Sequence, residues 1–278
     1  MRDGARFELI DDLAFPVPFL VISAMLGMPI DRADELREWS QVITRTLEPT
    51  TGMAELDESD RAFGLLLPFL NEVIADRRRN LGSDMLSSLI SAEESGDKLS
   101  ADELVTFVVL LYIAGHETTV NLIGNSMLAL LRHPDQLALA RATGLDSNAV
   151  DELLRFDGPV QHTVRVPIVP VTFNVGDHSI TVEPGERVLT SLGAASHDPS
   201  VFDEPHRLDL RRPNANKHLA FAAGIHYCLG SALAKLEAQV AIESLLRRFS
   251  SVELADEPSW RDRLTIRGVD RLELAVAR

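Results

Sequence analysis

Apolar residues recur at helical spacing through most of the chain. Charged and apolar residues follow this period at 31–46 and 61–79, again near 150–156, and from Leu229 onward. Each of these segments is long enough for two or more helical turns. The pattern therefore predicts a chain built mainly from α-helices.

A strand-like pattern occupies a shorter part of the chain. Residues 164–175 and 180–192 carry β-branched side chains in alternation, separated by glycine-containing turn signals. Alternation returns at 271–276, near the C-terminus. Because no repeat, low-complexity tract or linker divides the chain, we expect one α+β domain over residues 1–278, mainly α with small β-sheets.

One predicted helix is long enough to pass through the centre of a domain. Ser100 and Glu103 have the capping-box pattern just before an apolar run, and helical periodicity continues to Arg132. At about 1.5 Å per residue this helix is roughly 50 Å long. Its middle holds the sequence AGHETT, residues 114–119, where glycine and polar side chains interrupt the apolar pattern.

The AGHETT residues allow two explanations. Glycine costs about 1 kcal/mol relative to alanine inside a helix, and a buried acid or hydroxyl needs a partner. A ligand that approaches the helix closely would explain them. Alternatively, Gly115 lets another helix pack closely and Thr118 donates a hydrogen bond to a carbonyl of the preceding turn. The pattern favours neither explanation.

Charge and composition narrow the class of protein. The formal net charge of −15 disfavours nucleic acid and anionic membranes as partners. Two apolar runs, at 13–28 and 104–115, fall short of the roughly 20 residues that span a bilayer. Pro16 and Pro18 interrupt the first run. We therefore expect neither a targeting segment nor a membrane span.

Three charged residues, Glu152, Arg155 and Arg165, have a role that depends on whether their side chains are buried. Glu152 and Arg155 lie three residues apart and share a helix face, where an exposed pair would contribute little. Arg165 lies among apolar residues of a predicted strand. A buried arginine there would need an anion, whereas an exposed one would need nothing.

The only cysteine, Cys228, lies in the stretch FAAGIHYCLG. A zinc site would need more ligands nearby, and a cysteine hydrolase would need His226, two residues away, to reach the thiol. An axial thiolate ligand of haem needs only one cysteine, since the porphyrin supplies four ligands. The helix predicted after Cys228 would favour the thiolate form.

Four motifs, in order along the chain, resemble those of the cytochrome P450 family. AGHETT is similar to the family's oxygen-activation segment, and Glu152 with Arg155 matches its ExxR signature. The sequence PHRL at 205–208 occupies the position of a third partner for that signature. The first segment, FELIDDLAFPVPFLVISAMLGMP, is similar to soluble bacterial members. The haem-ligand loop of the family is matched at Phe221, Gly224, His226, Cys228 and Gly230.

The resemblance implies a role for each matched residue. Cys228 would be the axial thiolate of haem b, and Glu117 and Thr118 would be the catalytic acid and alcohol that relay protons to bound dioxygen. A buried structural cluster of Glu152, Arg155 and Arg207 would fix the cysteine loop. Further cofactor contacts would come from His226 and Arg165 at the propionates, Phe221 and Gly224 in the loop, and Ala114 and Gly115 on the dioxygen side.

The implied activity is that of a haem-thiolate monooxygenase. Such an enzyme inserts one oxygen atom from O2 into a small apolar molecule of terpenoid, steroid, fatty-acid or polyketide type. The protein would be bacterial and cytoplasmic, with electrons supplied from NAD(P)H through a ferredoxin reductase and a ferredoxin. The substrate pocket would be lined by Leu110, Ile113, Gln161, His162 and Thr163. A ferredoxin would dock near Arg211, Arg212, Lys217 and Lys235.

The chain departs from the family mainly in its length. Bacterial members carry further strands and helices before the segment that begins at Phe7, including a helix whose Trp-x-x-x-Arg motif contacts a propionate. Trp39 does not supply this motif, because Ile43 stands where the arginine would be. We therefore expect a cytochrome P450 fold that lacks its N-terminal part. The alternative function is a haem-poor or inactive relative that serves as a scaffold for a partner enzyme. A smaller departure is Ala222, where the family more often has glycine.

Overall fold

A computed structural model describes residues 5–94 and 99–277, and its fold is mainly helical with small β-sheets, as the sequence predicts. Short π and 3-10 turns link several of the helices. The α-helices are α1 Pro16–Leu26, α2 Ala33–Thr44, α3 Met53–Arg79, α4 Met85–Glu94, α5 Ala101–Arg132, α6 Pro134–Thr143, α7 Ser147–Asp157, α8 Leu192–Ala195 and α9 Ser231–Arg248.

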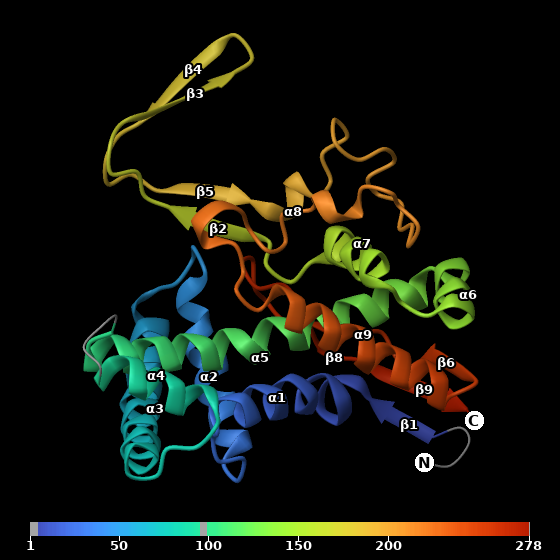
Figure 1. Ribbon diagram of the computed structural model, residues 1–278. Helices are drawn as coiled ribbons and strands as arrows, with labels where there is room; N and C mark the ends of the chain where they lie inside the picture. The colour runs from blue at the N-terminus through green and yellow to red at the C-terminus, as the bar shows by residue number, and fades with distance from the viewer. Residues whose placement is uncertain (1–4, 95–98, 278) are drawn as a thin grey trace.

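The strands form one three-stranded sheet and three two-stranded sheets, all antiparallel. In the larger sheet β9 lies between β1 and β6, so the first and last strands pair at one side of the molecule (Figure 1). The other sheets pair β2 with β5, β3 with β4, and β7 with β8. The strands are β1 Ala5–Glu8, β2 His162–Arg165, β3 Val171–Val175, β4 His178–Val182, β5 Val188–Ser191, β6 Ser251–Leu254, β7 Ser259–Trp260, β8 Val269–Arg271 and β9 Glu273–Ala277.

Helix α5 runs through the helical part of the molecule, in contact with α1, α3, α4, α7 and α9 (Figure 1). It begins and ends where the sequence predicts. The Ser100 hydroxyl accepts from the Glu103 N–H at 3.3 Å, and the Glu103 carboxylate accepts from the Ser100 N–H at 2.8 Å. Among the described residues α5 is the one helix long and apolar enough to cross a membrane, but 56% of its most apolar window is buried inside the fold.

The hydrophobic core is one continuous cluster that extends from Phe7 to Val276. At the start of the chain, Pro16 occupies the first turn of α1, where its missing N–H leaves no hydrogen bond unmade. Gly27 ends this helix in the left-handed conformation, with φ of 63°. The apolar run at 13–28 is therefore largely a core helix with a start and a stop of its own.

Residues 162–191 form two nested antiparallel pairs. Strand β2 pairs with β5, and the β3–β4 hairpin lies between them in sequence, closed by the two-residue turn Gly176-Asp177. Figure 1 shows this hairpin projecting away from the helical body. Every residue of β3 is exposed. The predicted strands are confirmed, but they are shorter than the sequence pattern suggests.

Candidate active site

The loop that carries Cys228 folds back on itself before α9 begins. The Cys228 N–H donates to the Phe221 carbonyl at 3.0 Å, which closes the loop, and Gly224 supplies a left-handed φ of 67°. Ala222 also adopts a left-handed φ, of 57°, which alanine disfavours. The Cys228 side chain lies half-buried at the end of this loop, just ahead of the first turn of α9.

An open cleft with a volume of about 240 Å³ lies between this loop and α5. It brings together several of the residues that the sequence singles out for chemistry. These residues are Ala114, Gly115 and Thr118 on α5, Thr163 on β2, and Phe221, His226 and Cys228 on the loop. Further apolar residues line its walls, and α9 contributes Leu233, Ala234 and Glu237.

The lining of the cleft fits a flat apolar group held by one sulfur ligand. Small residues, Ala114 and Gly115, line the α5 side, and Cys228 is the one thiol. Burial raises the pKa of the Cys228 thiol, an effect that the Gly230 N–H partly offsets, so the loop by itself favours the protonated thiol and not the thiolate that the sequence predicts. In the described part of the chain, no three His, Cys, Asp or Glu side chains cluster as a metal site would need, which disfavours zinc.

The structure bears out both parts of the structural explanation for the AGHETT residues of α5, the close helix packing at Gly115 and the hydrogen bond of Thr118. A Cβ on Gly115 would lie 2.8 Å from Ile22 Cγ1, so this glycine lets α1 pack closely. The Thr118 hydroxyl donates to the Ala114 carbonyl at 3.1 Å. Because Gly115 and Thr118 also line the cleft, packing and ligand access use the same residues.

His116 and Glu117 point into protein rather than into the cleft. His116 Nε2 lies 3.0 Å from the Ser40 hydroxyl and Nδ1 lies 2.7 Å from the Tyr112 carbonyl. Burial lowers the pKa of His116, so its ring is neutral at pH 7. Glu117 is 2% exposed and forms an ion pair with the buried guanidinium of Arg261. The cleft lining does not include Glu117.

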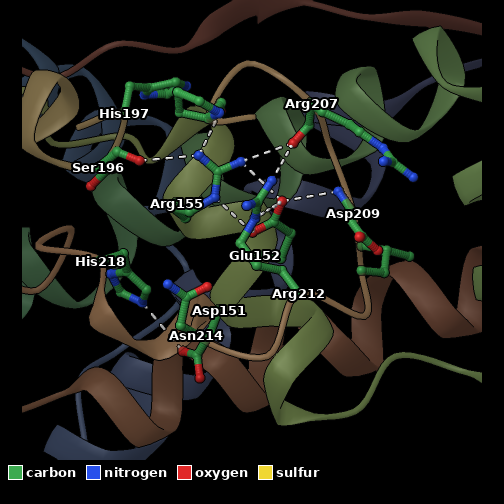
Figure 2. Close-up of polar contacts among 12 residues, drawn as sticks. Asp151, Glu152, Arg155, Ser196, His197, Arg207, Asp209, Arg212, Asn214 and His218 are labelled. Carbon is green, nitrogen blue, oxygen red and sulfur yellow. Dashed lines mark hydrogen bonds and ion pairs between the residues drawn. The ribbon is translucent and has the colours of Figure 1, made fainter. Parts of the chain in front are cut away.

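Glu152 and Arg155 form a fully buried ion pair on α7 (Figure 2). Arg155 Nε donates to Glu152 Oε2 at 2.7 Å, and Nη2 donates to Oε1 at 2.9 Å. The same guanidinium donates to the carbonyls of Ser196, Pro205 and Arg207. This pair therefore connects α7 to the segment that leads into the cysteine loop.

The third member of this cluster is Arg212, and the prediction of Arg207 is wrong. Arg212 Nε donates to Glu152 Oε2 at 3.0 Å, and the Arg212 side chain is 6% exposed. The Arg207 side chain is 60% exposed and pairs with Glu204 (Figure 2 shows it directed away). Arg207 contributes only its carbonyl, which accepts from both buried arginines.

The residue before Glu152 makes a second anchor that the sequence analysis missed. Asp151 Oδ1 lies 3.3 Å from His218 Nε2 and 2.7 Å from Lys235 Nζ. His218 Nδ1 accepts from the Ala220 N–H, so Nε2 carries the proton that is donated to Asp151. Asp151 thus joins α7 to both flanks of the cysteine loop. Sequence spacing gives no signal for contacts over 67 residues.

Several other predicted site residues lie outside the cleft lining. Arg165 is exposed and donates a hydrogen bond to the Val164 carbonyl. The Gln161 amide donates to the Gly158 carbonyl. His162 Nδ1 lies 3.1 Å from the Leu264 carbonyl oxygen. Leu110 is 58% exposed, and Ile113 packs against the core. Gly224 shapes the loop backbone without lining the cleft.

Of the predicted docking cations, Arg212 and Lys235 are held in the two anchors, whereas Arg211 and Lys217 are exposed.

Comparison with known proteins identifies the family. The family model described as Cytochrome P450 matches residues 43–141 and 145–265. The chain is 42% identical to "Cytochrome P450 107B1" of Saccharopolyspora erythraea over 96% of its length and 64% of that protein. It is 40% identical to "Vitamin D(3) 25-hydroxylase" of Pseudonocardia autotrophica over 97% of its length and 65% of that protein.

Solved structures show the same likeness. The structure of P450BioI in complex with acyl carrier protein bearing hexadec-9Z-enoic acid superposes with a TM-score of 0.90 and 40% sequence identity, covering 98% of this chain and 69% of that one. The chain thus spans somewhat less than two thirds of the length of the curated relatives it matches. With a matching family model over most of its residues and these identities, the chain belongs to the cytochrome P450 family.

Proposed function

We propose that residues 1–278 form one haem-thiolate domain that binds haem b in the cleft between α5 and the Cys228 loop and acts as a monooxygenase. The observation that carries the proposal is the position of the only cysteine, on the cleft that small residues of α5 also line. Bound haem would supply the activation of dioxygen and the transfer of an oxygen atom.

The residues of this chain would hold and orient that group. Cys228 would be its axial ligand, and the Phe221 carbonyl would keep the loop closed through the Cys228 N–H. His226 lines the cleft, where a propionate is a suitable partner for an imidazole. The pair Glu152 and Arg155, with Arg212, would hold the loop in place from behind.

The two expected proton-relay residues have protein partners in this structure. Glu117 is ion-paired with Arg261, and the Thr118 hydroxyl donates to the Ala114 carbonyl. A role in proton transfer would require each residue to leave its present partner. Arg165 would likewise need to turn from the Val164 carbonyl to reach a propionate.

The relatives support the proposed class of substrate. One relative is a vitamin D(3) 25-hydroxylase, and P450BioI was solved with acyl carrier protein bearing hexadec-9Z-enoic acid, which supports a small apolar substrate for this chain too. Electrons would arrive from NAD(P)H through a ferredoxin reductase and a ferredoxin in the cytoplasm. Arg211 and Lys217 are the exposed cations that would remain for docking a ferredoxin, because Arg212 and Lys235 are already paired.

The test is haem loading followed by an absorption spectrum of the reduced, carbon monoxide-bound protein. We expect the red-shifted Soret band of a thiolate ligand in the wild type and in the control Tyr227→Phe, whose side chain is exposed. Cys228→Ser should lose this band while the chain still folds. An unshifted band at full haem loading, or the same spectrum from Cys228→Ser, would overturn the proposal.

A second candidate function rests on the exposed apolar hairpin. Phe173 and Ile180 face each other across β3 and β4 and are 44% and 54% exposed, which suits a surface that binds another polypeptide. A haem-poor scaffold would co-elute with a partner enzyme in size-exclusion chromatography of co-expressed proteins. An oxygenase need not co-elute with a partner enzyme.

A further inference from the structure

Glu48 lies in the turn after α2, and its carboxylate is held by a run of backbone N–H groups. The N–H groups of Leu264 and Thr265 donate to Glu48 Oε2 at 2.8 and 2.9 Å, and the N–H of Ile266 donates to Oε1 at 3.4 Å. Successive N–H groups that converge on one anion form a preorganised site for negative charge. The loop between β7 and β8, residues 261–267, therefore binds a carboxylate that follows α2.

Side chains of the same loop reinforce this contact. Arg263 donates to the Gln41 carbonyl at 2.9 Å and to the Thr44 hydroxyl at 3.1 Å. The Thr265 hydroxyl donates to the Leu47 carbonyl at 3.0 Å. The end of α2 is thus joined to the loop by several hydrogen bonds, among which those to the carboxylate have a charged acceptor and are the stronger kind.

The loop also backs one wall of the cleft. The Gln161 N–H donates to the Thr265 carbonyl at 2.8 Å, and Val160 forms an antiparallel bridge with Ile266. Val160 lines the cleft. Because Ile266 bonds Glu48 through its own N–H, a single backbone segment separates the carboxylate from the lining of the cleft.

We propose that Glu48 is a positioning residue for the substrate side of the cleft. It fixes the 261–267 loop, and the loop fixes the wall that carries Val160 and Thr163, against which an apolar substrate is held. The proposal rests on the proposed function, because it assigns the wall a role in holding a substrate beside the haem. Among the described residues that line the cleft, none belongs to the loop or to the turn after α2, so Glu48 acts through backbone hydrogen bonds and not by contact with the substrate.

The first test needs no haem. In the full chain, amide hydrogen exchange at 264–266 should be about 10-fold faster in Glu48→Gln than in wild type, because a neutral amide replaces the charged acceptor. The increase should extend to the wall, residues 160–163, at about 2-fold or more. Exchange in the cysteine loop, residues 221–230, should stay at its wild-type rate. Mass spectrometry of peptic fragments measures all three segments in one experiment.

The matched control is Glu58→Gln, which removes a carboxylate from an exposed ion pair with Arg45 and should leave exchange in all three segments unchanged. Faster exchange that is confined to 264–266 would overturn the proposal, since the loop would then move without the wall. Faster exchange throughout the chain, the cysteine loop included, would also overturn it, because Glu48 would then only stabilise the fold.

The second test separates this inference from the proposed function. Haem-loaded Glu48→Gln should keep the thiolate-type Soret band of the reduced, carbon monoxide-bound wild type. It should bind 4-phenylimidazole about 5-fold more weakly, followed by the change in haem absorption, while imidazole binds as in wild type, since only the phenyl group reaches the apolar wall. Cys228→Ser should do the reverse: it loses the band and keeps wild-type exchange at 264–266 and 160–163. Equal affinity of wild type and Glu48→Gln for 4-phenylimidazole would overturn the positioning role, whereas loss of the band in wild type would overturn the proposed function alone.

A second variant covers the case in which Glu48→Gln does not fold. Glu48→Asp keeps the charge on a side chain one carbon shorter, so it should retain part of the contact with the three N–H groups. We expect exchange at 160–163 and affinity for 4-phenylimidazole between those of wild type and a chain without the contact. Glu48→Asp that exchanges faster at 264–266 but keeps the wild-type wall and affinity would overturn the proposal.

Discussion

Two regions of the chain differ in the kind of side chain that they bury and the kind that they expose. Around α7, charged groups are buried and each is paired, as Glu152 is with Arg155 and Arg212. In the hairpin arm, residues 166–187, apolar groups are exposed: Ile168 is 91% exposed. The cysteine loop is thus anchored by contacts within this chain, whereas the arm gains little from the core. The α7 region should therefore respond strongly to substitution and the arm weakly.

The largest effect is expected from Arg212→Met. This change leaves the Glu152 carboxylate buried with one partner fewer, which should lower the free energy of unfolding by about 3 to 5 kcal/mol. Urea unfolding followed by circular dichroism measures it. The matched control is Arg207→Met, which removes an exposed pair and should leave the free energy of unfolding almost unchanged. Equal losses in the two variants would contradict the assignment of Arg212 as the third member of the cluster.

The second anchor should give a smaller and pH-dependent effect. Asp151→Asn removes the charge that holds Lys235 and His218, at a cost of about 1 to 3 kcal/mol at neutral pH. Burial pushes the pKa of Asp151 upward, but His218 and Lys235 outweigh it and the pKa is lowered.

The direction of the pH dependence follows from this lowered pKa. The advantage of wild type over Asp151→Asn should be full above the unfolded-state pKa of about 3.9. It should disappear as the pH falls through the lower folded-state value. Urea unfolding between pH 7 and 3 checks this, with Asp177→Asn in the arm as the control that should show no such change. A difference that grows toward acid pH would contradict it.

A third effect concerns the cysteine loop backbone. Ala222→Gly relieves a left-handed φ of 57° and should stabilise the chain by about 1 kcal/mol. The neighbouring Ala223 has an extended φ of −153°, so Ala223→Gly should instead destabilise slightly through the unfolded state. Thermal unfolding of the two variants should therefore shift in opposite directions. Shifts of the same sign would show that the loop is not strained at Ala222.

The sequence predicts the parts of this molecule that depend on local patterns. Helix α5 is one such part, because its cap at Ser100 and its apolar period are both local. The cysteine loop is another, because its motif is contiguous. Partner choice over long distances is not readable in the same way. Arg207 and Arg212 lie five residues apart in a segment of turns, and nothing in their spacing tells which guanidinium turns inward. The Glu117 pairing with Arg261, over 144 residues, is equally invisible.

The smallest effect is expected in the arm. Phe173→Thr replaces an exposed ring on β3, and Ile180→Thr replaces its partner on β4; each should change the free energy of unfolding by no more than about 0.5 kcal/mol. Threonine is β-branched and suits a strand, so the hairpin should persist in both variants. Urea unfolding checks the stability, and light scattering checks whether the apolar arm drives self-association. A loss comparable to that of Arg212→Met would mean that the arm is packed against the body in solution, and the contrast between the two regions would fail.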